Sequence, residues 1–180
     1  MTTTSHIEIL LRGEVIKLFS EIEKTLSIMV LFGQADKVAE TQKDEAIKLK
    51  GMMMAQKIET TIESLKKYHP NVWKENKQLF EELICLKRFR NRIAHCPISW
   101  DEKDASSFII WDIDTAEDNI QYHKAFRYTI IECQRHLDEI ESVSNRLMDL
   151  LPKIIGKHTE LIKLILAGRA KERTKKDFES

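Results

Sequence analysis

Residues 79–95, LFEELICLKRFRNRIAH, decide the fold of this chain. Their apolar side chains recur every three or four positions, which places them on one face of an α-helix. They are Leu79, Leu83, Leu86, Phe89, Ile93 and Ala94. Pro97 disfavours helical geometry at the residue before it, so the helix is expected to end close to His95. Asn71 is a suitable N-cap for its other end, and the stretch therefore predicts the second half of a long amphipathic helix.

The same periodicity recurs on both sides of this helix. It predicts helices over residues 7–32, about 47–68 and about 121–150, with Pro152 and Gly156 at the end of the last, and a short final helix near residue 164. Around 106–120 the pattern changes to β-branched and aromatic residues, which predicts a short strand or hairpin. We therefore expect an all-α, up-and-down bundle of four to five helices with this insertion. Residues 1–168 are expected to form one domain, and residues 169–180 a flexible basic tail.

The composition excludes several classes of protein. The 180 residues include 29 Lys plus Arg and 29 Asp plus Glu, so the formal net charge is zero. A neutral chain binds nucleic acid only through locally clustered charge. Three cysteines without CxxC spacing favour a reducing compartment. No secretory signal or membrane-length apolar run is present in the sequence, and we expect a cytoplasmic protein with no membrane partner.

Most of the residues that could take part in catalysis or ligand binding lie at the carboxyl end of the helix over 79–95. Four cations, Lys87, Arg88, Arg90 and Arg92, lie in its last turns beside His95. At 100° per residue, Arg90 falls within the apolar arc. A buried arginine needs a partner there: a carboxylate of another helix, a phosphate or a subunit interface. Arg88, Asn91, Arg92 and His95 lie on the opposite side, where a solvated charged face competes with a functional role.

His95 and Asn91 add the groups needed for proton transfer. An imidazole takes and gives protons near neutral pH, and Asn91, four residues earlier, is placed to orient it. An arginine stabilises charge on a phosphate. Together these groups suffice for RNA cleavage in which the 2′-hydroxyl attacks the adjacent phosphate without a metal ion.

The sequence RNRIAH at residues 90–95 resembles the Arg-x4-6-His motif of the HEPN (higher eukaryotes and prokaryotes nucleotide-binding) superfamily, in the form with Asn directly after Arg. Arg88 also satisfies the spacing. Motif and helical frame together span roughly residues 7–155. The resemblance implies a homodimeric, metal-independent endoribonuclease that acts as a toxin or in antiphage defence. It also implies that Arg and His of both subunits face one another across a cleft.

These observations give a set of expected roles. The expected catalytic residues are Arg90, Asn91 and His95, and the expected RNA-binding residues are Lys87, Arg88 and Arg92; no metal or cofactor is expected. Arg90 and His95 diverge by about 140° on an ideal helix, so two chains are expected to complete the site. The expected partners are RNA, a second copy, and an antitoxin or nucleotidyltransferase. The alternatives are a non-catalytic RNA-binding or dimerisation module of this fold, and a helical adaptor in which Arg90 is a buried ion-pair residue.

Overall fold

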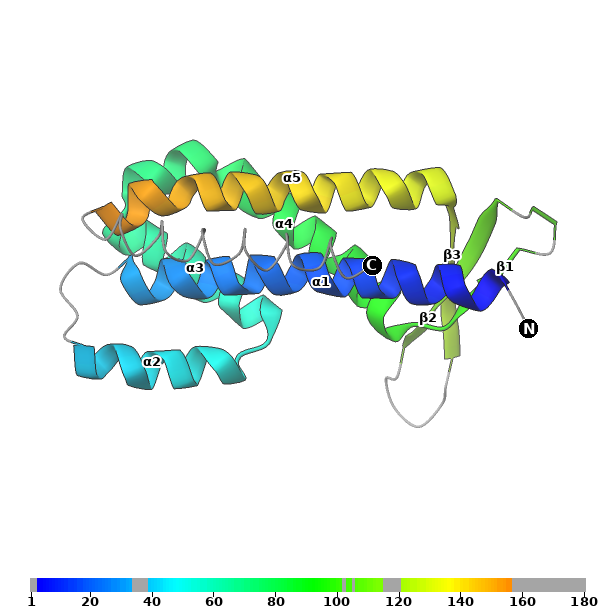
Figure 1. Ribbon diagram of the computed structural model, residues 1–180, viewed down its shortest axis with the longest axis horizontal. Coiled ribbons are helices and arrows are strands. Elements are labelled where there is room, and N and C mark those ends of the chain that lie inside the picture. Colours follow the sequence, from blue (N-terminus) through cyan, green and yellow to red (C-terminus); the bar gives the residue numbers. More distant parts are fainter. Residues whose placement is uncertain (1–2, 34–38, 102, 105, 115–120, 157–180) are drawn as a thin grey trace, which may run out of the picture. The chain divides into compact units, whose positions relative to one another are not determined.

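The computed structural model describes residues 3–33, 39–101, 103–104, 106–114 and 121–156. Within these residues the chain is mostly helical, with one small antiparallel sheet (Figure 1). The helices are α1 (Thr3–Phe32), α2 (Ala39–Gly51), α3 (Met54–Tyr68), α4 (Pro70–His95) and α5 (Ile130–Ile155). The strands are β1 (Ile98–Trp100), β2 (Ser107–Asp114) and β3 (Gln121–Thr129). A helical fold with a strand insertion is thus confirmed.

The helix that decides the fold ends as predicted, but its N-cap was predicted wrongly: α4 begins at Pro70, so Asn71 lies within its first turn. α4 ends at His95, just before Pro97, and five of the six residues expected on its apolar face are buried, with Ala94 half-exposed. α1 also follows the prediction and ends at Phe32, before Gly33. Prolines and glycines mark these boundaries because they are poorly compatible with a continuing helix.

The single helix predicted over about 47–68 is wrong, because the chain breaks into α2 and α3 at residues 52–53. Gly51 ends α2, and the backbone of Met53 is extended, with φ −67° and ψ 156°. The Gln56 side chain accepts a hydrogen bond from the Met53 backbone N–H at 2.9 Å, which caps the start of α3. The apolar spacing alone did not distinguish one helix from two.

The helix predicted to start near residue 121 is also wrong, since residues 121–129 form strand β3. The sheet has the order β1-β2-β3, and Phe108 of β2 pairs with Tyr128 of β3. The insertion is therefore larger than the hairpin expected around 106–120. α5 begins instead at a capping box: the Thr129 backbone N–H donates to Glu132 Oε2 at 2.8 Å, and the Glu132 N–H donates to Thr129 Oγ1 at 3.1 Å.

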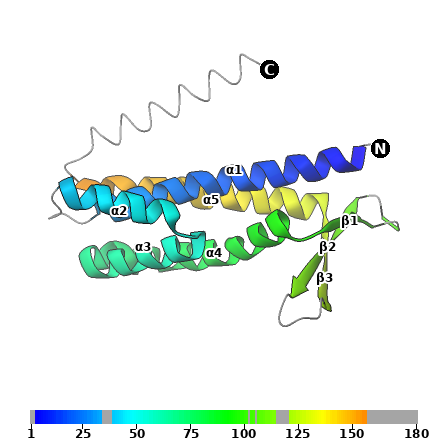
Figure 2. The ribbon, with the colours of Figure 1, turned by 90° about the horizontal axis from the view of Figure 1, so that it is seen from below.

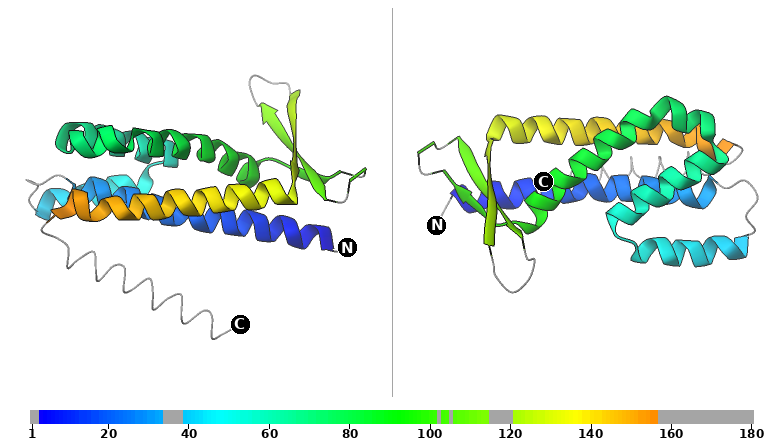
Figure 3. Two further views of the ribbon diagram at one scale, coloured as in Figure 1. Left: turned by 90° about the horizontal axis from the view of Figure 1, so that it is seen from above. Right: turned by 180° about the vertical axis from the view of Figure 1, so that it is seen from behind.

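The chain divides into two compact units, each built from segments distant in sequence. The first contains Met1–Lys24 and Lys77–Arg146, and the second Thr25–Asn76 and Leu147–Ser180. In the first unit, the sheet lies where α4 ends and α5 begins (Figures 2 and 3). The core of this unit includes Val15, Ile22, Phe80, Leu83, Ile93, Ile110 and Ile140. The core of the second includes Leu26, Met29, Ile58, Leu65 and Leu147.

Other expectations on organisation keep the status of predictions. The single domain over 1–168 is one of them. The short final helix and the basic tail over 169–180 lie outside the described residues. None of the described helices is both long and apolar enough to cross a membrane.

Candidate functional site

The predicted site residues all lie in the last three turns of α4, within the first unit. Arg88, Asn91 and His95 are exposed, whereas Lys87 and Arg90 are half-buried. The angular prediction therefore holds for these three exposed residues, whereas Arg92, predicted on the same face, is half-buried. It also holds in part for Arg90, whose Nε atom is buried although its guanidinium reaches the surface.

The structure brings Arg90, Asn91 and His95 of one chain together. Arg90 Nη1 lies 3.2 Å from Asn91 Oδ1 and 3.3 Å from His95 Nε2. The expected divergence of Arg90 and His95 is thus corrected: the Cα directions differ, but the long arginine side chain reaches the imidazole. The hydrogen bond that the structure gives Asn91 goes to Arg90, so Asn91 orients the guanidinium rather than the imidazole.

The contact with Arg90 engages Nε2 of His95. All guanidinium nitrogens are donors, so Nε2 of His95 is the acceptor in this contact. To act as a general base, Nε2 would exchange this contact for one with the group that it deprotonates. The short polar cluster of Arg90, Asn91 and His95 thus places a cation next to a base at an exposed helix end.

Arg90 retains unused hydrogen-bonding capacity. Its Nε is buried with no hydrogen-bond partner among the described residues. Within those residues no carboxylate pairs with it either, so the expected alternative of a buried Arg–Glu pair is not observed. A buried donor without a partner is unfavourable, whereas the terminal nitrogens of the same guanidinium lie at the surface, where an anion would bind.

The Arg92 side chain packs against the sheet, although it was expected on a face open to RNA. Its guanidinium carbon lies 3.8 Å from the centroid of the Phe126 ring, and its Nη1 donates to the Tyr128 hydroxyl at 3.3 Å. Both aromatic residues belong to β3, which was expected to be helical. Arg92 therefore joins the end of α4 to the sheet, in contrast to Arg88, which is exposed.

Aromatic side chains also hold α4 against β3 and α5. The Phe89 ring lies 5.6 Å from that of Tyr128 and 4.3 Å from that of His136, between centroids. Such contacts add about 0.5–1.5 kcal/mol per pair to the burial of area. At the start of α5, hydrogen bonds from Thr129 lower the pKa of the Glu132 carboxyl. The helix that carries the site is thus packed against β3 and the start of α5.

A residue that sequence reasoning missed caps α4. Arg12 of α1 donates from Nη1 to the carbonyl oxygen of Ile93 and from Nη2 to that of Cys96, the latter at 2.8 Å. Glu8, one turn earlier, accepts from Arg12 Nε at 2.9 Å. The signal in the sequence was Pro97: it has no N–H, so the Ile93 carbonyl lacks its usual helical donor and needs another.

Other chemistries find little support in the described residues. No group of three or more His, Cys, Asp or Glu side chains there could hold a metal ion. The Cys133 thiol is buried, which raises its pKa to about 12 and keeps it from acting as a thiolate nucleophile.

Comparison with known proteins does not add to this description. The chain matches no family model, no curated protein and no solved structure. The chemistry of the α4 end is therefore what points to a function.

Proposed function

We propose that this protein is a metal-independent endoribonuclease of HEPN type, which cleaves single-stranded RNA by attack of the 2′-hydroxyl on the adjacent phosphate. In this proposal the helices form an up-and-down bundle, as is typical of that superfamily. The observation that carries it is the contact between Arg90 Nη1 and His95 Nε2 at 3.3 Å, with Asn91 Oδ1 on the same guanidinium.

The position of Arg90 suits a phosphodiester. A phosphate oxygen would accept from the terminal nitrogens of the guanidinium, which lie at the surface. The charge that develops on the phosphorane oxygens in the transition state would then be stabilised by a cation that Asn91 already orients. Exposed Arg88 and half-exposed Lys87 would contact neighbouring phosphates.

His95 supplies the proton transfer in this reaction. Its Nε2 takes the proton of the 2′-hydroxyl, the 2′-oxygen forms a bond to phosphorus, and the bond from phosphorus to the 5′-oxygen breaks. The leaving 5′-oxygen receives a proton from an imidazolium. The products are a 2′,3′-cyclic phosphate and a 5′-hydroxyl, so no water or cofactor is consumed.

A second copy of the chain would bring a second His95 to the same phosphate. One imidazole would then act as base while the other, protonated, acts as acid, which is the arrangement that the HEPN resemblance implies. The two copies would form a homodimer. An antitoxin or nucleotidyltransferase partner would control it if the protein acts as a toxin or defence effector.

The test is cleavage of a mixed RNA substrate in EDTA by the wild type, Arg90→Ala and His95→Ala. Arg135→Ala is the matched control, because Arg135 is an exposed arginine of the same unit on α5. We expect cyclic-phosphate ends from the wild type and the control. Loss of either key side chain should reduce the rate by at least about a hundredfold.

Two results would contradict this proposal. Equal cleavage by wild type and His95→Ala would place the activity elsewhere. No cleavage by folded, dimeric wild type would favour the non-catalytic module, and the variants would then be compared for RNA binding.

A further inference from the structure

The end of α4 has an unusual cap. In a regular helix, the carbonyl of Ile93 would accept from the N–H four residues later, but that residue is Pro97. Arg12 of α1 fills this place, and its second terminal nitrogen binds the Cys96 carbonyl at 2.8 Å. One planar guanidinium therefore bridges two backbone carbonyls on either side of His95.

The geometry points to Arg12 as a positioning residue for His95; this inference rests on the proposed function. The fork of Arg12 holds the carbonyls of Ile93 and Cys96, one peptide beyond His95 on each side, which restricts how far the short backbone segment that carries the imidazole can move. Its charge also lies at the negative end of the helix dipole, where a cation is favourable. His95 itself is exposed, so the cap supplies the order that packing does not.

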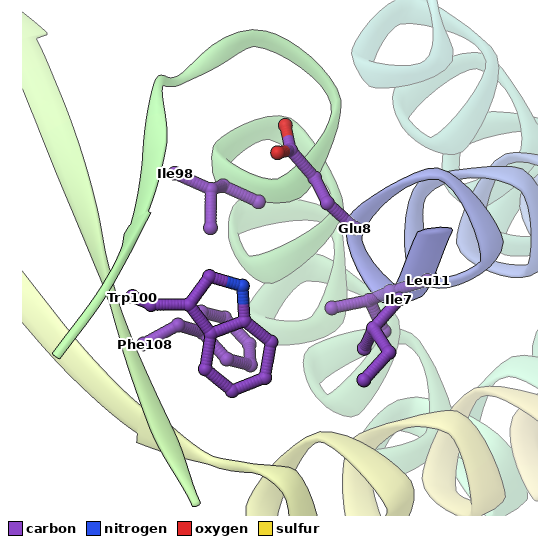
Figure 4. Close-up of a pocket in the computed structure, with 6 residues that line it drawn as sticks. All are labelled: Ile7, Glu8, Leu11, Ile98, Trp100 and Phe108. Carbon is purple, nitrogen blue, oxygen red and sulfur yellow. The ribbon is translucent and has the colours of Figure 1, made fainter. Parts of the chain in front are cut away.

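Glu8 makes Arg12 a rigid donor rather than a flexible surface arginine. Its Oε1 lies 2.9 Å from Arg12 Nε and 2.8 Å from Nη2, and only 24% of the Arg12 side chain is exposed. Figure 4 shows Glu8 beside Ile98 at the edge of a small apolar pocket that Leu11, Trp100 and Phe108 also line. Leu11 and Phe108 are buried there. Packing of α1 on the sheet therefore sets where the guanidinium reaches α4.

Lysine cannot replace this arrangement. An ammonium is a point charge that would satisfy one carbonyl at a time, and it lacks the planar fork. Arg12→Lys keeps the charge and most of the aliphatic stem, so it separates the positioning role from general stability. A displacement of a catalytic group by about 1 Å lowers a rate by about a hundredfold.

The experiment compares the wild type with Arg12→Lys in two measurements. The first is kcat and KM for RNA, corrected for the folded fraction. The second is the nitrogen NMR spectrum of the imidazoles, in which His95 is assigned by its absence from His95→Ala. Lys17→Gln is the matched control, because the exposed pair of Lys17 and Glu14, 2.8 Å apart, also lies on α1.

We expect Arg12→Lys to lower kcat by about a hundredfold, with KM nearly unchanged, and to shift or broaden the His95 signals. Lys17→Gln should change neither. Wild-type kcat per folded molecule together with unchanged His95 signals would overturn the inference. If Arg12→Lys does not fold, Glu8→Gln replaces it, with a smaller change in the same direction.

The NMR measurement separates the two proposals. If the wild type cleaves no RNA, the proposed function fails, and the His95 signals alone decide the role of Arg12. A change confined to Arg12→Lys then supports positioning of the imidazole, and its absence refutes it.

Discussion

At the carboxyl ends of both α4 and α1, a side chain distant in sequence donates to a free backbone carbonyl, but the surroundings of the two ends differ. Each helix leaves carbonyl oxygens without an intrahelical donor. At α1 the Gly33 carbonyl accepts from His69 Nε2 at 2.6 Å, and Gly33 is itself buried. At α4 the donor is Arg12, and His95 is exposed. A histidine is used as the cap at one end and is left available for chemistry at the other.

The difference shows the effect of capping a helix with a side chain from another helix. Because Arg12 comes from α1, the side chains of the last turns of α4 are not needed to satisfy their own backbone. Arg90, Asn91 and His95 can then interact with one another. At the end of α1 no such freedom exists, since Gly33 has no side chain and is closely packed.

The strongest test of this comparison replaces each of the two histidines by alanine in turn. His95→Ala is expected to lower RNA cleavage by about a thousandfold, because it removes the proton-transfer group. It should change the free energy of unfolding by less than about 0.5 kcal/mol, since the side chain is exposed. Cleavage kinetics and urea denaturation measure the two effects.

His69→Ala is the mirror variant. It leaves the Gly33 carbonyl without its donor, and we expect unfolding to become easier by about 1–3 kcal/mol, with cleavage per folded molecule unchanged. A large loss of cleavage from His69→Ala, with little from His95→Ala, would reverse the assignment of the two ends.

Gly33→Ala tests how closely the α1 end is packed. A Cβ there would lie 2.3 Å from the Met29 carbonyl oxygen and 2.9 Å from Ile154 Cγ2. We expect the free energy of unfolding to fall by about 2–3 kcal/mol. Gly13→Ala on the same helix is the control: nothing lies within 4 Å, and a gain of about 0.5–1 kcal/mol is expected. Similar denaturation midpoints for both variants would show that the α1 end tolerates a side chain.

Arg92 and Arg88 sharpen the description of the α4 end. Arg92→Ala removes the contact with Phe126 at 3.8 Å and should lower the free energy of unfolding by about 1 kcal/mol. Arg88→Ala removes an exposed charge and should leave stability unchanged, while the slope of log affinity for RNA against log salt decreases by about 1. Equal stability losses would mean that both arginines are packed.

The smallest expected effect is a pH dependence confined to the unit that carries the α4 end. Hydrogen bonds from Ser106 and Ser107 lower the pKa of Asp104 from 3.8 to about 2, and Arg127 Nη2 lies 3.0 Å from its Oδ2. A lowered pKa favours the folded state above pH 3.8, and this gain is lost as the pH falls towards 2.

The measurement compares urea midpoints of wild type and Asp104→Asn between pH 6 and pH 2.5. The difference should be constant above about pH 4 and shrink below it. A difference that does not change over this range would show that ionised Asp104 contributes nothing specific to the fold.

Local sequence signals correctly predicted the helices that end at a glycine or a proline. α1 and α4 are confirmed because each combines a long apolar stripe with Gly33 or Pro97 at its end. The region 47–68 failed because the break at Met53 depends on a local cap, not on periodicity. Residues 121–129 failed because Phe126 fits a helical step as well as strand alternation, and pairing with β2 decides between them.

The sequence by itself determined a mostly helical chain, the helix that ends at His95 and the clustering of Arg90, Asn91 and His95 near that end, because all of these depend on neighbours within a few residues. Only the tertiary structure decided that Arg12 caps this helix and that Arg92 packs on β3. Arg12 and Ile93 are 81 residues apart in sequence. Contacts over such distances depend on how the helices and the sheet pack, and no local pattern encodes them.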